Sequence, residues 1–233
     1  MNIIITGATK GIGKAVATLF ASKGFDICAC ARSEQDLEAL KSELLALNDK
    51  IKVFVKSCDV SKKNEVLNFA DFCLNNLGKV DILINNAGVF LPGAICEEPD
   101  GTLEKLIETN LYSAYNLTRS IAPSMKKNKK GHIFNLCSVA SINSYDTGGS
   151  YAISKFALLG FSKNLRAELM QYNIRVTAVL PGAVLTESWA GTTLPESRFI
   201  EVDDVASLIY NAWEISERSV VEEILIRPML GDI

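Results

Sequence analysis

Hydrophobic residues gather in short runs along the chain, and longer amphipathic segments separate them. Apolar runs of strand length occur at residues 2–6, 26–31, 51–57, 80–84, 131–137, 174–180 and 223–227. Several are rich in Ile and Val, which is typical of strands buried on both faces of a parallel sheet. The segments between them carry helical spacing, as at Leu37, Leu40 and Leu44. The pattern predicts a doubly wound, seven-stranded parallel sheet with helices on both faces.

This alternation continues from one end of the chain to the other. No Pro- or Ser-rich linker, fixed-period repeat or low-complexity tract interrupts it. Residues 1–233 are therefore expected to form a single domain with a Rossmann fold. Two turn-rich regions, 138–150 and 181–200, follow predicted strands. We expect both at the carboxyl edge of the sheet, where open α/β sheets bind ligands.

Composition narrows the possible partners. The net charge of -3 shows no basic excess, so nucleic acid is not an expected partner. No basic region precedes the first apolar run, and no stretch reaches the roughly 18 apolar residues that cross a bilayer. Six scattered cysteines form no CxxC pair, which favours reduced thiols in a cytoplasmic protein. The single histidine, His132, has no partner motif, so we expect no metal site.

A glycine-rich turn links the first predicted strand to an amphipathic helix that we expect to begin near Lys14. Residues 6–13 read Thr-Gly-Ala-Thr-Lys-Gly-Ile-Gly. Glycines allow a tight turn and let the main chain approach a pyrophosphate closely. The helix start adds unpaired N–H groups and the positive end of the helix dipole. The turn therefore predicts a dinucleotide site.

The end of the second predicted strand distinguishes between the two nicotinamide dinucleotides. An NAD site usually carries an acidic residue there, for the ribose 2′-hydroxyl. Here the strand ends at Arg32-Ser33, and Glu34 and Asp36 fall where the first turn of the next helix should lie. Arg32 can bind a 2′-phosphate, and Lys10 can approach the same group. The sequence predicts NADP(H), although either cation could instead form a surface salt bridge.

Tyr151 and Lys155 open a long helical segment. Their i, i+4 spacing places the phenol and the ammonium on one helical face. A free tyrosine has a pKa of about 10, which is too high for efficient proton exchange at neutral pH. We expect the lysine charge to lower that pKa and make Tyr151 a proton donor and acceptor.

Together these motifs resemble the short-chain dehydrogenase/reductase family over essentially the whole chain. The resemblance rests on residues 6–13, Asp59-Val60, residues 85–88 (Asn-Asn-Ala-Gly), Asn110, Ser138, Tyr151, Lys155 and Pro181-Gly182, which occur in the family's order. It implies an enzyme that interconverts a carbonyl compound and an alcohol. Another Rossmann-type enzyme, such as a methyltransferase or a nucleotide-sugar epimerase, is an alternative. Epimerases of this superfamily space their glycines differently and usually add a substrate domain after the sheet. A non-catalytic NADP(H)-sensing scaffold would be favoured by loss of Ser138, Tyr151 or Lys155, and none is lost.

The resemblance also implies roles for single residues. Ser138, 13 residues before Tyr151, would hydrogen-bond the substrate carbonyl, and Asn110 would hold a water that links Lys155 to solvent. Tyr151 would transfer the proton, and Lys155 would bind the nicotinamide ribose. The full set expected at the cofactor is Gly7, Thr9, Lys10, Gly11, Ile12, Gly13, Arg32, Ser33, Asp59, Val60, Asn86, Ala87, Gly88, Tyr151, Lys155, Pro181, Gly182, Val184 and Thr186.

Departures from the family pattern leave the substrate open. Cys137 stands where many relatives have a second serine, which should be tolerated. The C-terminal strand lacks the glycine-rich ending common in 3-oxoacyl-carrier-protein reductases. It looks more like the ending of the sepiapterin-reductase-like and hydroxy-acid dehydrogenase branches. A 3-oxoacyl thioester, a 3-hydroxy acid and a pterin or diketone all remain candidates, and we expect only a small lid after Thr186.

The helical segment 151–172 is apolar on more than one face. One face can cover the sheet, and the surplus predicts burial against another subunit. Members of the resembled family commonly pair this helix and the preceding one, around 101–127, in dimers and tetramers. We therefore expect a homodimer or homotetramer, with Leu158 and Phe161 as candidates for the outward-facing contacts.

Overall fold

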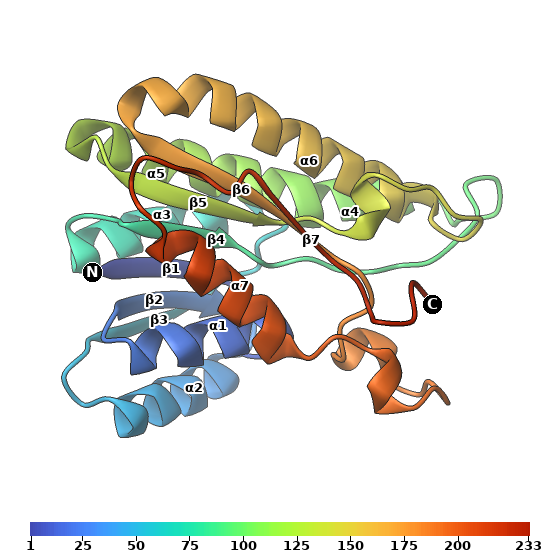
Figure 1. Ribbon diagram of the computed structural model, residues 1–233, viewed down its shortest axis with the longest axis horizontal. Coiled ribbons are helices and arrows are strands. Elements are labelled where there is room, and N and C mark those ends of the chain that lie inside the picture. Colours follow the sequence, from blue (N-terminus) through green and yellow to red (C-terminus); the bar gives the residue numbers. More distant parts are fainter.

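Seven parallel strands form one sheet in the computed structural model, which describes residues 1–233 (Figure 1). The spatial order is β3-β2-β1-β4-β5-β6-β7. The chain thus winds outward in one direction from β1 and then in the other from β4. The strands are β1 (Asn2–Thr6), β2 (Asp26–Ala31), β3 (Val53–Ser57), β4 (Ile82–Asn85), β5 (Gly131–Leu136), β6 (Ile174–Pro181) and β7 (Glu223–Ile226).

Helices cover both faces of the sheet. They are α1 (Gly11–Ser22), α2 (Glu34–Leu47), α3 (Lys63–Leu77), α4 (Thr102–Ile107), α5 (Ser113–Asn128), α6 (Gly149–Leu169) and α7 (Val202–Glu214). One buried cluster joins the sheet to α1, α2 and α7, and a second joins it to α3, α5 and the end of α6. The predicted fold is confirmed as a single Rossmann-type domain.

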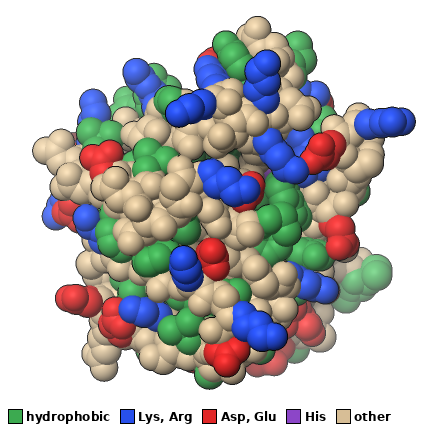
Figure 2. Space-filling model, turned by 90° about the vertical axis from the view of Figure 1, so that its left-hand side faces the viewer, with side chains coloured by type: hydrophobic (Ala, Val, Ile, Leu, Met, Phe, Trp, Pro, Cys, Tyr) green, Lys and Arg blue, Asp and Glu red, His purple; other side chains and the backbone are tan.

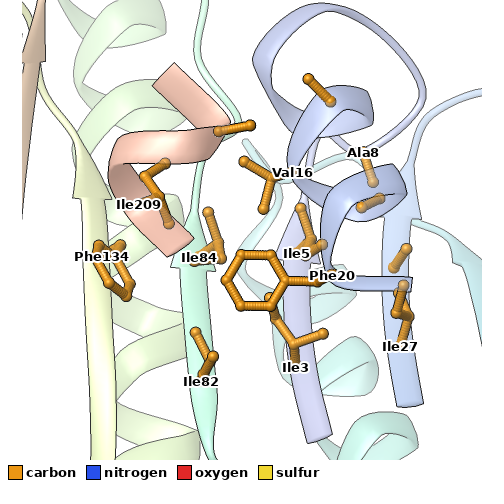
Figure 3. Close-up of a cluster of buried hydrophobic side chains, with 14 of the residues drawn as sticks. Ile3, Ile5, Ala8, Val16, Phe20, Ile27, Ile82, Ile84, Phe134 and Ile209 are labelled. Carbon is orange, nitrogen blue, oxygen red and sulfur yellow. The ribbon is translucent and has the colours of Figure 1, made fainter. Parts of the chain in front are cut away.

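The strand sequences explain the two cores. In β1, Ile3 and Ile5 belong to the cluster under α1 and α7, whereas Ile4 between them belongs to the opposite cluster. This alternation is the period of two that a strand imposes on its side chains. Figure 3 shows Ile3 and Ile5 gathered around the ring of Phe20 from α1. A strand buried on both faces needs apolar residues at every position, as the Ile run provides.

Some boundaries differ from the sequence expectation. Helix α1 begins at Gly11 rather than near Lys14, so the last two glycines of the loop form its first turn. The predicted helix at 101–127 is divided, because a π-helical turn (Glu108–Tyr112) separates α4 from α5. Such turns widen a helix locally and occur often at functional sites.

The orientation of Leu158 on α6 differs from the sequence expectation that it faces outward. Leu158 points inward and is only 2% exposed, in a cluster with Leu159 and Leu180. The exposed apolar side chains of this helix are instead Ile153 at 41% and Phe156 at 46%. Leu158 therefore cannot serve as an outward contact, since its side chain already packs beneath the helix.

The loops that follow β1, β4, β5 and β6 gather at the carboxyl edge of the sheet. The C-terminus returns to the same end of the molecule as the segment after β6, at the right of Figure 1. On the face shown in Figure 2, cationic and anionic side chains are interspersed without a large region of one sign. None of the helices combines the length and the apolar character that spanning a bilayer requires.

Candidate active site

The glycine loop leaves room for a ligand at the start of α1. Gly7 and Gly11 adopt positive φ angles of 65° and 52°, which side chains on L-residues disfavour. A β-carbon at Gly13 would lie 2.2 Å from the Gly7 carbonyl oxygen, so the turn requires glycine there too. The loop thereby presents the N-terminus of α1, a 12-residue helix, to the groove above it. This arrangement fits a pyrophosphate.

Asn86 fastens the loop to the neighbouring strand. Its amide nitrogen donates to the carbonyl oxygens of Thr6 at 2.9 Å and Gly7 at 3.0 Å. The Thr6 hydroxyl accepts from the backbone N–H groups of Asn86 and Ala87, each at 3.0 Å. These contacts join the ends of β1 and β4, the adjacent strands at which the winding direction reverses. Ligands bind at this position in doubly wound folds.

The residues expected around the 2′-phosphate share one corner. Arg32 follows β2, and its carbonyl oxygen accepts from the Ser57 hydroxyl at 2.9 Å. The pKa of Lys10 is raised, chiefly by its contact with Glu187 and less by Asp36, while Arg32 opposes the rise. Lys10 and Arg32 therefore influence each other electrostatically.

Two neighbours of this corner have structural roles. Ser33 caps α2, where its hydroxyl accepts from the Asp36 N–H at 3.1 Å. Glu34 and Asp36 lie in the first turn of that helix, as the sequence predicted. Asp59, after β3, accepts from the backbone and hydroxyl of Ser61 at 3.1 and 2.8 Å.

Ser138, Tyr151 and Lys155 line one cavity of about 900 Å³ at the carboxyl edge. Ser138 lies two residues after the end of β5 and caps a short 3-10 turn, while the other two lie one turn apart on α6. The Lys155 ammonium donates to the Leu136 carbonyl at 2.7 Å and lies 5.8 Å from the centre of the Tyr151 ring. Further lining residues from the predicted set are Ile12, Asn86, Gly88, Pro181, Gly182, Val184 and Thr186.

Burial dominates the proton affinities in this cavity. It raises the pKa of Tyr151, and the neighbouring Ser138 side chain only partly opposes the rise. Burial also lowers the pKa of Lys155 to about 8. The expected lowering of the tyrosine pKa by the lysine charge is therefore wrong for this geometry. The ammonium donates to the Leu136 carbonyl, and burial of the phenol is the largest influence on the Tyr151 pKa.

Asn110 lies in the π-helical turn and is buried. Its side-chain oxygen accepts from the Val89 N–H at 2.8 Å, and its nitrogen donates to the Val89 carbonyl at 3.0 Å and the Ser154 hydroxyl at 2.9 Å. A β-carbon at Gly88 would lie 3.2 Å from the Asn110 oxygen and 3.5 Å from the Lys155 nitrogen. Asn110 thus joins the loop after β4 to α6 beside Lys155. Its expected water-holding role stays a prediction.

The sequence analysis did not identify Glu98, which holds the start of α6. Its carboxylate accepts hydrogen bonds from both the backbone N–H and the hydroxyl of Ser150, next to Tyr151. A β-carbon at Gly149 would lie 2.1 Å from this carboxylate, so glycine is required there. The acid also compensates the helix dipole. In sequence, Glu98 sits in an acidic run that reads as solvated surface, and no local signal marks it.

Aromatic side chains complete the cavity. Phe90 packs edge-to-face on Tyr151, with 4.7 Å between ring centres. Trp189, from the segment after β6, also lines the cavity and packs edge-to-face on Phe199. Thr186 closes against the glycine loop, since a β-carbon at Gly11 would lie 3.0 Å from its methyl group. The segment from Thr186 to Ile200 is thus a short lid, with two 3-10 turns.

The histidine lies outside this site. His132 is buried in β5, shares a hydrogen bond of 2.7 Å with the Thr177 hydroxyl and stacks on Phe134. Burial lowers its pKa well below the ordinary value. No group of three or more His, Cys, Asp or Glu side chains is arranged to hold a metal ion.

The fold and site together define a dinucleotide-dependent oxidoreductase, and comparison with known proteins agrees. Residues 1–196 match the short chain dehydrogenase family. The chain is 33% identical to sepiapterin reductase of Chlorobaculum tepidum, over 99% of this chain and 97% of that protein. It therefore belongs to the short-chain dehydrogenase/reductase family and is an NAD(P)-dependent enzyme of carbonyl–alcohol oxidoreduction.

Solved structures resemble the whole chain. An alcohol dehydrogenase from the archaeon Thermococcus sibiricus, complexed with 5-hydroxy-NADP, superimposes with a TM-score of 0.92 at 26% identity, covering 100% of this chain and 98% of that one. A 7α-hydroxysteroid dehydrogenase complexed with NADH and 7-oxo glycochenodeoxycholic acid gives 0.88 at 30% identity, covering 99% and 94%. Relatives of this fold thus include complexes with either type of dinucleotide.

Proposed function

We propose that the chain is an NADP(H)-dependent reductase of a ketone or aldehyde, with Ser138, Tyr151 and Lys155 as its catalytic residues. One observation carries the proposal. These three side chains meet in a single cavity that opens beside a glycine loop built for a pyrophosphate. A non-catalytic scaffold would have no need to retain the three groups in one place.

The cofactor would lie along the carboxyl edge, from the corner of Arg32 to the cavity. The N-terminus of α1 would hold its pyrophosphate, Asp59 and Val60 the adenine, and Asn86, Ala87 and Gly88 the adenosine ribose side. Ile12, Pro181-Gly182, Val184 and Thr186 would contact the nicotinamide half. When bound, NADPH supplies the hydride for the carbonyl carbon. The protein's own contribution is to orient the substrate and to deliver a proton.

The proton comes from Tyr151 in this proposal. Because burial raises its pKa, the phenol carries its proton at neutral pH and is ready to donate it to the carbonyl oxygen. Ser138 lies in the same cavity and would donate a hydrogen bond that fixes the carbonyl. The Lys155 ammonium, held by the Leu136 carbonyl, would bind the nicotinamide ribose.

The preference for NADP(H) rests on charge at the end of β2. Lys10 and Arg32 share the corner expected for the 2′-phosphate, and no carboxylate occupies the position directly after the strand. The Thermococcus sibiricus relative was solved with an NADP derivative, which supports this choice. A tenfold preference needs only about 1.4 kcal/mol, which one charge-assisted contact supplies.

The proposal extends to assembly and location. A second copy of the chain could pack against exposed apolar side chains of three elements. These are Ile153 and Phe156 on α6, Tyr112 in the π-helical turn and Tyr115 on α5. A homodimer or homotetramer would bury them, in keeping with closed symmetry. We place the protein in the cytoplasm, on the strength of its unpaired cysteines.

Initial-rate assays of NADPH oxidation test the function directly. The substrates are diketones, pterins, 3-oxoacyl thioesters and 3-oxo acids, each with NADPH and with NADH. We expect turnover of at least one carbonyl class, at least tenfold tighter binding of NADPH by calorimetry, and inversion of that preference by Arg32→Asp. Binding of NADPH without reduction of any class would favour the sensing scaffold instead.

A further inference from the structure

The cavity around Tyr151 contains an unequal set of charged groups. Among its 27 lining residues, Lys155 is the single cation, whereas Asp146 and Asp232 are both acids. The Lys155 ammonium already donates to the Leu136 carbonyl at 2.7 Å. In the proposed function it also binds the ribose. No cation of the cavity wall is therefore free to receive an anionic substrate.

The guanidinium that pairs with the cavity residue Asp232 is also occupied. Arg227, directly after β7, forms this ion pair with the Asp232 carboxylate. With the Asn143 amide turned so that its oxygen faces the guanidinium, a second terminal nitrogen of Arg227 donates to that oxygen at 2.9 Å and joins the C-terminal segment to the loop after β5. The Asp232 carboxylate lies beside Gly182, where a β-carbon would approach it to 3.2 Å. The neutralised pair thus stands at the nicotinamide end of the cavity.

Of the 27 lining residues, 13 are hydrophobic, and most of the others are uncharged polar residues such as Ser138, Asn143 and Ser188. Phe90 and Pro92 come from the loop after β4, Val139 and Tyr145 from the loop after β5, and Trp189 from the lid. Such walls stabilise uncharged, flat or apolar groups by burial. A carboxylate placed in this cavity would lose part of its hydration without gaining a cationic partner, and Asp146 would repel it.

We infer that this enzyme selects uncharged carbonyl substrates and rejects those that carry a carboxylate. The inference rests on the proposed function, because it concerns the substrate of the same cavity. It favours the diketone and pterin type of substrate, and neutral thioesters, over 3-oxo and 3-hydroxy acids. Rejection by an unmatched like charge is a common source of specificity.

A matched series tests the inference without a known natural substrate. Acetoacetate, acetoacetamide and methyl acetoacetate share the 3-oxobutanoyl group, and the amide nearly matches the carboxylate in size. We expect kcat/KM for the amide and the ester to exceed that for the acid by more than tenfold at neutral pH. A ratio below tenfold would overturn the inference while leaving the reductase function intact.

Two variants identify the source of the discrimination. Asp232→Asn releases the Arg227 guanidinium, and Asp146→Asn removes the opposing charge. Each should raise kcat/KM for acetoacetate relative to acetoacetamide by at least fivefold. Asp71→Asn, on the exposed surface of α3, should leave that ratio unchanged. If neither cavity variant changes the ratio, the inference is contradicted. If the enzyme reduces no member of the series and no other neutral carbonyl compound, the proposed function is contradicted instead.

Discussion

The Lys10 ammonium lies 2.7 Å from the Glu187 carboxylate, and this ion pair joins the glycine loop to the lid. Both side chains are exposed, and Lys10 is one of the two cations expected at the 2′-phosphate. If Lys10 binds the 2′-phosphate as we propose, the lid would compete with the cofactor for the same positive charge. Binding of NADPH would exchange one partner of Lys10 for another.

We predict that Glu187→Gln tightens NADPH binding by about twofold to fivefold, the range expected when a weak surface ion pair no longer competes. NADH lacks the 2′-phosphate, so its affinity should change little. Calorimetric titration of both cofactors measures the difference. Glu43→Gln is the matched control, because Glu43 pairs with Lys14 at the same distance of 2.7 Å. Equal gains for NADH and NADPH would show that the lid does not act through Lys10.

The buried Lys155 should reduce the stability of the fold. Its pKa of about 8 lies below the ordinary 10.5, so between these values the folded protein binds fewer protons than the unfolded chain. Stability thus rises with pH across this window, and the penalty is fully present below about pH 8. Lys155→Met should remove it and stabilise the protein at pH 7 by on the order of 2–3 kcal/mol, while activity is lost.

Urea unfolding at pH 7 and pH 10 measures this effect, and the gain should shrink at the higher pH. Lys163→Met on the exposed side of the same helix serves as the control, with a change of about 0.5 kcal/mol or less. A Lys155→Met protein that is less stable than the parent at pH 7 would mean that the hydrogen bond to Leu136 outweighs the burial of charge.

The exposed apolar face of α6 leads to a prediction on assembly. Phe156 is 46% exposed, and burial against a second copy would gain about 25 cal/mol per Å². Light scattering should give the mass of a dimer or tetramer at micromolar concentration. Phe156→Glu should shift the mass toward the monomer, and Phe156→Leu should not. A monomeric parent protein with full activity would defeat this proposal.

The sequence was informative wherever local pattern decides the structure. The period of two in β1, the glycines before α1 and the spacing of Tyr151 and Lys155 all act over a few residues. The fold class and the gathering of these groups at the carboxyl edge followed from them.

The contacts that a sequence pattern does not predict join residues far apart in the chain. Glu98 meets Ser150 across 52 positions, and Lys10 meets Glu187 across 177. Neither acid differs locally from a solvated surface residue. The pKa of Tyr151 was misjudged for the same reason, because the direction of the Lys155 ammonium and the burial of the phenol depend on tertiary packing. Helical spacing alone also did not reveal which way Leu158 points.

The central claim is that Tyr151 delivers the proton to the substrate. The direct measurement is the kcat of carbonyl reduction by Tyr151→Phe, together with the Kd of NADPH for the same protein. The ring of Phe preserves the packing against Phe90, so NADPH affinity should stay within about threefold while kcat falls by about 10²–10⁴. A variant that binds NADPH normally and retains more than half of the parent turnover would contradict the mechanism.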